Sequence, residues 1–172
     1  MDETLWRSLE LERLSLAALL EELTPEQWET PSLCALWRVR DVAAHVAMTP
    51  TATATGTLLR QLVRARGDLW AAAAQVAVEH ARRPTEGIVE ELRRDAAART
   101  MPRVTNPENI LMDALVHGQD VAVPLGIDRP MPTAAAEASF ARVWEVGWPF
   151  HARRRLTGLR LVATDADVDV GA

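Results

Sequence analysis

Apolar residues in the first part of the chain recur at helical spacing. They fall three, four or seven positions apart, which is the repeat of one face of an α-helix. Glu12 and Arg13 border this stripe, where we expect a half-buried ion pair between them. The pattern predicts a long N-terminal helix with one face in a core. The stripe consists of Leu5, Leu9, Leu16, Leu20 and Leu23.

Short polar motifs indicate where further helices begin. Thr24 precedes Pro25 and Gln27, an arrangement typical of a capped helix start with a proline in the first turn. Asn106 before Pro107 indicates another start. The remaining expected helices run from Asp68 to about Ala81, from Thr85 to about Thr100 and from Thr133 to about Arg155.

A second apolar face begins at Val39 and continues through Val42, Ala43 and Val46. Pro50 is expected to end or kink this helix. The Thr/Ala-rich stretch 49–56 has no clear assignment and separates it from residues 58–66.

Only the segment 158–163 alternates like a β-strand, and residues 124–132 are rich in turn formers. We therefore predict an all-α, four-helix-type bundle with at most one short strand at its C-terminus. The bundle is expected to span residues 1–156, and residues 157–172 form a C-terminal extension.

Composition narrows the functional classes. A length of 172 residues with 48% hydrophobic residues suits one domain, and a net charge of -5 argues against a nucleic-acid binder. All 19 basic residues are Arg, a usage typical of a GC-rich bacterium. No apolar run approaches the roughly 20 residues that span a bilayer, and the acidic start is unlike a signal peptide. The single Cys34 excludes an internal disulfide, so we expect a cytoplasmic protein.

Two segments place an acidic residue four positions before a histidine. These are Asp41 with His45, and Asp113 with His117, where Asp120 follows on the same helix face. If the two faces meet, His45, Asp113 and His117 supply two imidazoles and a carboxylate, which suits an open divalent metal site. Asp41 and Asp120 would then orient the rings through their second nitrogens. The alternative is that both are ordinary solvent-facing helix surfaces.

Several other residues carry chemistry without a clear pattern. Cys34 is a candidate nucleophile, but no histidine is near it in sequence, and a small buried hydrophobe is the favoured interpretation. His80 and His151 precede arginines and are expected to be exposed at helix ends. Arg153–Arg155 is expected to be a solvated helix end, with an anion subsite as the alternative. Trp28 and Trp37 are expected to fill the core.

Three segments of this sequence resemble a known family. They are W-x-x-PSLC-x-x-W-x-VRD-x-x-AH from Trp28 to His45, D-x-L-x-HGQD from Asp113 to Asp120, and LRLVATD-x-D from residue 159. The chain resembles the mycothiol-dependent maleylpyruvate isomerase family, part of the DinB-like group of metal-binding helical bundles. The resemblance implies a metal, usually zinc with nickel as the alternative, held by His45, Asp113 and His117. Many relatives have Glu where this chain has Asp113.

The resemblance also implies an activity. Mycothiol would bring its thiol to the open metal position and act on a small electrophile by isomerisation or S-transfer. The expected partners are thus a thiol and an electrophile, without nucleic acid or membrane; a homodimer is left open. The competing hypothesis is a non-catalytic helical bundle, with or without metal, that binds other proteins. Relatives usually continue past the ATD-x-D segment, so residues 157–172 are interpreted as a truncated start of the family's C-terminal region, with a naturally short member of the family as the alternative.

Overall fold

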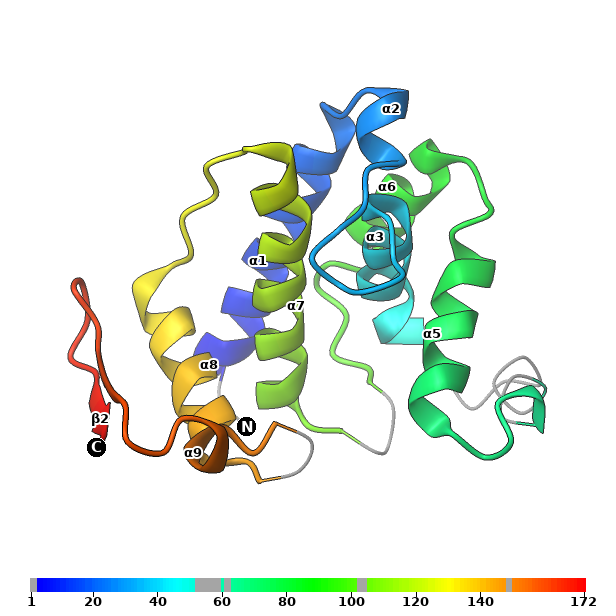
Figure 1. The fold of residues 1–172 in the computed structure, drawn as a ribbon. Coiled ribbons are helices and arrows are strands. Elements are labelled where there is room, and N and C mark those ends of the chain that lie inside the picture. The colour runs from blue at the N-terminus through cyan, green and yellow to red at the C-terminus, as the bar shows by residue number, and fades with distance from the viewer. Residues whose placement is uncertain (1–2, 52–59, 61–62, 102–104, 148–149) are drawn as a thin grey trace.

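Helices make up nearly all of the regular structure (Figure 1). The computed structural model describes every residue except 1–2, 52–59, 61–62, 102–104 and 148–149, so most of the segment 49–66 lies outside the described residues. The helices are α1 (Glu3–Glu21), α2 (Pro25–Trp28), α3 (Val39–Met48), α5 (Leu69–His80), α6 (Thr85–Arg94), α7 (Pro107–Ala122), α8 (Thr133–Glu145) and α9 (Ala152–Arg155). Short 3-10 turns at Thr49–Thr51 and Val123–Leu125 follow α3 and α7, and two strands, β1 (Arg160–Val162) and β2 (Asp169–Gly171), end the chain.

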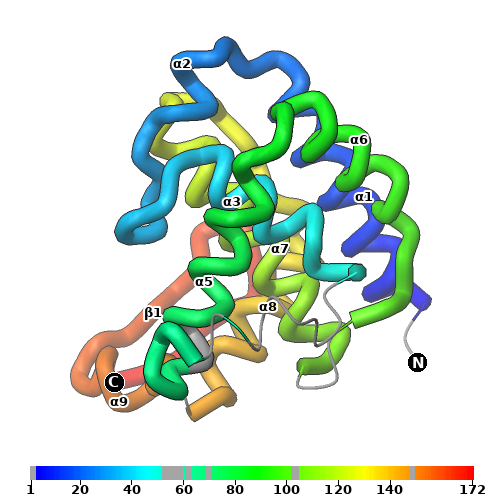
Figure 2. The backbone as a smooth tube through the Cα atoms, turned by 90° about the vertical axis from the view of Figure 1, so that its right-hand side faces the viewer, coloured from blue at the N-terminus to red at the C-terminus, as the bar shows by residue number. Residues whose placement is uncertain are grey.

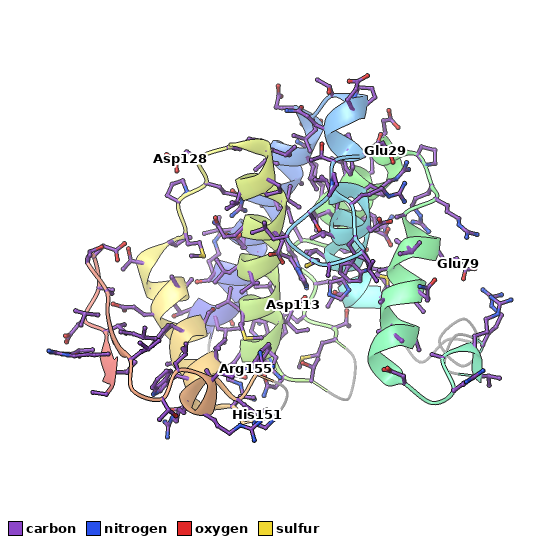
Figure 3. All side chains as sticks on the ribbon, in the orientation of Figure 1. Glu29, Glu79, Asp113, Asp128, His151 and Arg155 are labelled. Carbon is purple, nitrogen blue, oxygen red and sulfur yellow. The ribbon has the colours of Figure 1, made fainter. Side chains whose placement is uncertain are left out.

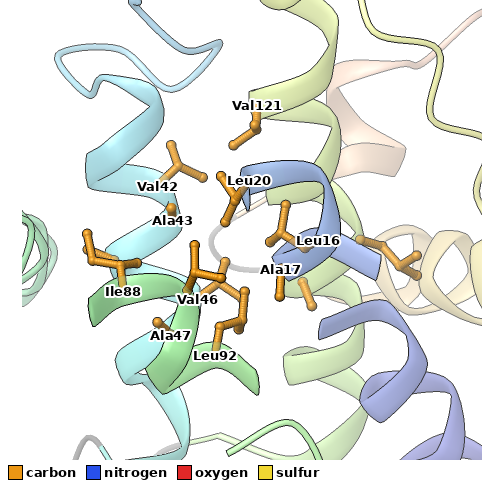
Figure 4. Close-up of a cluster of buried hydrophobic side chains, with 14 of the residues drawn as sticks. Leu16, Ala17, Leu20, Val42, Ala43, Val46, Ala47, Ile88, Leu92 and Val121 are labelled. Carbon is orange, nitrogen blue, oxygen red and sulfur yellow. The ribbon is translucent and has the colours of Figure 1, made fainter. Parts of the chain in front are cut away.

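Four of these helices share the main core. α1 packs against α6 and α7, and α3 packs against the same two helices, so the four close into a bundle (Figure 1 and Figure 2). α5 covers α3 from outside, and α8 covers α7. The predicted all-α four-helix bundle is confirmed. Figure 4 shows the shared core, to which α1 contributes Leu16, Ala17 and Leu20, α3 contributes Val42, Ala43, Val46 and Ala47, α6 contributes Ile88 and Leu92, and α7 contributes Val121.

Three of the predicted helix starts, at Thr24, Asp68 and Asn106, are confirmed by side-chain caps. The Thr24 hydroxyl accepts the Gln27 N–H, and the Gln27 side chain accepts the Thr24 N–H in return. Asp68 and Asn106 each accept a backbone N–H three residues later, which satisfies one of the free donors of the first helical turn. Along the described part of the chain, no helix is both long and apolar enough to cross a membrane.

The helix predicted from Thr85 to about Thr100 is shorter than expected and ends at Arg94. Its end coincides with a buried arginine of α1. Arg13 provides hydrogen-bond donors for carbonyl groups of the turn that directly follows the helix. One guanidinium nitrogen lies 3.5, 3.2 and 3.0 Å from the carbonyl oxygens of Asp95, Ala96 and Ala98.

The C-terminal region also differs from expectation. The single helix predicted from Thr133 to about Arg155 is divided into α8 and α9, because Val146 after α8 has extended backbone angles. Gly147 and Pro149 in the sequence were the unused signals of this break. The predicted strand is confirmed as β1, but it pairs antiparallel with an unpredicted strand, β2.

Candidate metal centre

Two imidazoles and a carboxylate lie together where α3 meets α7. Nε2 of His45 is 3.2 Å from Oδ2 of Asp113, and Nε2 of His117 is 3.4 Å from Oδ1 of the same carboxylate. One donor atom from each residue falls within 4.8 Å of the others. Figure 3 labels Asp113 between α7 and α3. The structure thus brings together the three residues that the sequence analysis singled out.

The second ring nitrogen of His117 has its own partners. Nδ1 of His117 is 2.9 Å from Oδ2 of Asp120, as expected for a residue that orients the ring. Cys34 Sγ donates to the same Asp120 oxygen at 3.0 Å and lies 3.5 Å from His117 Nδ1. Cys34 was expected to be a small buried hydrophobe; the structure leaves it partly buried and places its thiol beside His117, a histidine far from it in sequence. No local pattern could reveal this contact, since Cys34 precedes His117 by 83 residues.

A tight loop between α2 and α3 delivers Cys34 to α7. The Ser32 N–H donates to the Trp37 carbonyl at 2.9 Å, and its hydroxyl accepts the Cys34 N–H at 3.1 Å. The Leu33 N–H donates to the Asp120 carbonyl at 3.2 Å. These bonds hold the thiol in place through the backbone, independently of its own contacts.

The same loop places an aromatic ring over both imidazoles. The ring centroid of Trp37 lies 5.3 Å from that of His45 and 6.0 Å from that of His117. The two imidazoles meet nearly edge to face at 4.9 Å. Trp28 is buried in the core as expected, whereas Trp37 is partly buried and also covers the imidazoles. Trp37 therefore shields one side of the donor set from water.

Mutual hydrogen bonding strongly shifts the pKa values of Asp113 and His117. Burial alone would raise the pKa of Asp113, but the charge of His45 and hydrogen bonds from both imidazoles hold that pKa well below its usual range. Burial would likewise lower the pKa of His117, yet hydrogen bonds to Asp113, Asp120 and Cys34 raise it to about 12. A cation that coordinates Nε2 of His117 must displace a proton, so its affinity should rise with pH.

A buried arginine lies behind this cluster. Burial lowers the pKa of Arg13 to about 10, against the opposing charges of Asp95 and Asp113. The expected ion pair between Glu12 and Arg13 is absent from the ion pairs of the described chain, because Glu12 pairs instead with Arg129 at 2.7 Å. A Cβ at Gly118 would lie only 3.0 and 3.1 Å from these two side chains, so this glycine lets the pair approach α7.

Asp41 is not where the sequence analysis expected it. The residue lies in the first turn of α3, and its carboxylate accepts the Arg38 backbone N–H and Nε–H, both at 2.9 Å. The Arg38 NH2 group donates to the other oxygen at 3.0 Å. Asp41 therefore caps its own helix and pairs with an arginine, and no hydrogen bond joins it to His45 among the described residues.

The remaining candidates lie away from the cluster. His80 does end a helix, but it is half-buried and bonds Glu91 at 2.6 Å, where exposure was expected. His151 is also only partly exposed and precedes α9. Arg153–Arg155 is solvent-exposed as predicted. None of these side chains belongs to a three-donor group in the part of the chain that the structure describes.

The geometry of the cluster suits a small divalent cation. Nitrogen and oxygen ligands on a tetrahedral zinc ion lie about 2.0–2.1 Å from the metal, hence roughly 3.3–3.4 Å from one another. The observed separations of 3.2 and 3.4 Å are close to this edge length, but they run to different oxygens of Asp113, so the carboxylate would have to turn for one oxygen to bind an ion beside both nitrogens. Among the described ion pairs, Asp113 pairs with the two imidazoles and with no arginine, so an ion that takes the place of their protons meets no arginine at the carboxylate. Two imidazoles and one carboxylate also leave a fourth position open.

Comparison with known proteins identifies the family. Residues 9–108 match the family model for the mycothiol maleylpyruvate isomerase N-terminal domain. No curated protein and no solved structure matches the chain. The matched region includes Cys34 in the loop and His45 in α3, but it stops before Asp113 and His117. Because the match covers more than half of the 172 residues, the chain belongs to the mycothiol maleylpyruvate isomerase N-terminal domain family.

Proposed function

We propose that this chain is a divalent-metal-dependent enzyme that uses mycothiol for isomerisation or S-transfer on a small electrophile. The observation that carries the proposal is the convergence of His45, Asp113 and His117 from two helices into one donor set. Family membership supports the choice of thiol. The nitrogen and oxygen donors support zinc, with nickel as the alternative.

A bound dication would lower the pKa of a thiol at the open position, so that a thiolate is present at neutral pH. A thiolate can add to an activated double bond, permit rotation and leave, which is isomerisation. It can also attack an electrophile and stay attached, which is S-transfer. Both outcomes require the same nucleophile, so they differ only in the electrophile.

The chain's own residues would prepare the site for this chemistry. Asp120 accepts a hydrogen bond from the Nδ1–H of His117 and would thereby leave Nε2 as the coordinating nitrogen. Trp37 covers both imidazoles and limits the access of water. The carboxylate of Asp113 reaches both rings, one through each oxygen, and so fixes their relative positions.

Metal analysis of untagged protein tests the first half of the proposal. We expect about one dication per chain in the wild type and its loss in His117→Ala. His80→Gln is the matched control, because His80 also bonds a carboxylate but has no second imidazole beside it. A wild-type chain that binds no dication and ignores chelator would overturn the proposal in favour of a non-catalytic bundle.

A thiol assay tests the second half. Mycothiol should raise the unfolding temperature only when metal is present, because a ligand that binds only the metal-loaded site stabilises that state. With a panel of electrophiles, S-transfer consumes one thiol for each turnover, whereas isomerisation changes the substrate spectrum and leaves the thiol titre constant. Thermal stability that does not respond to mycothiol at any metal loading would contradict the thiol-dependent function.

A further inference from the structure

The two nitrogens of His117 face two different groups of donor atoms. Nε2 faces Asp113 and His45, which form the donor set discussed above. Nδ1 faces Cys34 and Asp120, and these atoms also lie within 4.8 Å of one another. The second group contains the only thiol in the chain. A thiol, an imidazole and a carboxylate are a complete set of ligand types for a soft or borderline cation.

The geometry of this second group is close to that of a coordination site. Thiolate and imidazole ligands on tetrahedral zinc are about 3.5 Å apart, given bond lengths of about 2.3 and 2.0–2.1 Å. Sγ of Cys34 and Nδ1 of His117 are already separated by 3.5 Å. The Asp120 oxygen is nearer, at 3.0 and 2.9 Å, and would retreat by about half an ångström to admit an ion.

The thiol is also held ready by the fold. Cys34 lies in the loop that Ser32 closes and that the Leu33 N–H ties to the carbonyl of Asp120. This backbone bond joins the thiol-bearing loop directly to the residue that supplies the carboxylate. The Cys34 side chain is only partly buried, so a cation can reach it from solvent.

We infer that Cys34, Asp120 and His117 form a second, thiolate-containing metal site that competes with the first for His117. The first site needs Nε2 free and a proton on Nδ1, which Asp120 accepts. The second needs Nδ1 free and a proton on Nε2, which Asp113 accepts at 3.4 Å. A neutral imidazole cannot satisfy both at once, because the two sites use opposite tautomers.

The consequence is a choice between cations. A thiolate prefers soft ions such as Cd²⁺, whereas the first site offers only nitrogen and oxygen donors. Binding of Cd²⁺ at the second site would withdraw His117 from the first and release the ion held there. The competition between the two sites for His117 rests on the proposed function, because it requires a metal at the first site. The thiolate site itself does not depend on the proposed function.

Titration of the metal-free chain with Cd²⁺, in a phosphine reductant, tests the inference. We expect one Cd²⁺ per metal-free wild-type chain and a near-ultraviolet thiolate-to-metal charge-transfer band. In a parallel titration of the zinc-loaded chain, Zn²⁺ should be displaced in step with that band. His45→Ala removes a donor of the first site alone and should keep the band. Cys34→Ser should lose the band, and Asp120→Asn should weaken Cd²⁺ binding while leaving the thiol intact.

The outcomes separate the two sites. A missing band in both the wild type and His45→Ala overturns the thiolate site, whatever happens to zinc. Two ions bound together to each wild-type chain, Zn²⁺ and Cd²⁺, overturn the exclusion. Loss of zinc in His45→Ala with a retained band supports both sites, whereas a band in a wild-type chain that never binds zinc refutes only the proposed function.

Discussion

Two Asp-x-x-x-His segments have the same spacing and opposite surroundings. Asp113 lies in the middle of α7, reaches two imidazoles, and has no arginine partner among the described ion pairs. Asp41 lies in the first turn of α3, where free backbone N–H groups and the Arg38 guanidinium occupy its carboxylate. An acidic residue four positions before a histidine therefore stays available as a candidate metal ligand only where no helix end and no arginine compete for it.

The comparison also explains why the site is asymmetric. α7 supplies two donors and the ring-orienting Asp120, whereas α3 supplies only His45. Two further side chains, Cys34 and Trp37, come from the loop before α3 instead of from the helix itself. Of the two polar residues predicted on this face of α3, Asp41 caps the helix and only His45 belongs to the donor set.

The largest expected effect is on Asp113. Asp113→Asn removes the only carboxylate that reaches both imidazoles, so we expect apparent metal affinity to fall by more than about 100-fold, beyond the effect of outer groups. Asp41→Asn, the same change at the same spacing, should leave metal stoichiometry unaltered. Competition with a chromophoric chelator measures both. Equal losses in the two variants would show that the segments do not differ in the way described.

A smaller loss of affinity is expected at Asp120. Asp120→Asn keeps all three donors of the first site but weakens the hydrogen bond that orients His117, which should cost about 10–100-fold in metal affinity. The exposed Asp128→Asn is the control. The same chelator competition applies. An affinity loss as large as that of Asp113→Asn would instead mark Asp120 as a direct ligand.

Substitution of Asp41 should lower the stability of the fold and leave the affinity for metal unchanged. Its carboxylate is nearly inaccessible, but Arg38 is 41% exposed, so solvent screening limits what the pair contributes. We expect Asp41→Asn to lower the free energy of unfolding by about 1–2 kcal/mol, as for a hydrogen-bonded charged group. Urea unfolding of the metal-free chain gives this value, and a double-mutant cycle with Arg38→Gln isolates the pair. A coupling near zero would contradict the assigned capping role.

A third carboxylate, Glu91, combines both environments and should show the smallest effect. Burial would raise the pKa of Glu91, but its hydrogen bond with His80 and the charges of His80, Arg83 and Arg94 lower that pKa below 4.5. A lowered folded pKa contributes stability that is present above the unfolded value and is lost as pH falls through the folded value. Urea unfolding at several pH values should therefore show a gap of roughly 1 kcal/mol between wild type and Glu91→Gln near neutral pH.

That gap should begin to shrink near pH 4.5, where the carboxyl of the unfolded chain takes up its proton, and should close only below the lower pKa of the folded chain. Glu90→Gln, an exposed neighbour on the same helix, should show no such pH dependence. A gap that widens towards low pH would mean that Glu91 is held in its neutral form.

Much of the fold could be predicted because local signals agree with it. The leucine stripe of α1 and the caps at Thr24, Asp68 and Asn106 depend only on residues a few positions apart. The end of α6 could not be predicted from local patterns. The carbonyl groups just after it bond to Arg13, which lies more than 80 residues earlier in the chain. The break after α8 was predictable from Gly147 and Pro149 but was overlooked.

The residues of the candidate site also fall into those that local spacing predicts and those that it does not. Helical spacing alone placed Asp113, His117 and Asp120 on one face, and the structure has them in contact. Cys34 and Trp37 lie in an irregular loop, where spacing carries no directional information. The arginines after His80 and its place at a helix end predict exposure, and its actual partner, Glu91, lies on the next helix, where no local pattern indicates it. Side-chain partners across elements are set by packing, which a single sequence does not display.

The separation of the donors along the chain has a consequence for how the protein matures. His45 and Asp113 are 68 residues apart, so a large loop must close before any ion can find two ligands. During synthesis α1, α3 and α6 emerge first and can present only one imidazole of the set. If the proposed metal binds, it can do so only after α7 has docked, and a bound ion would then report that the last helix of the bundle is in place.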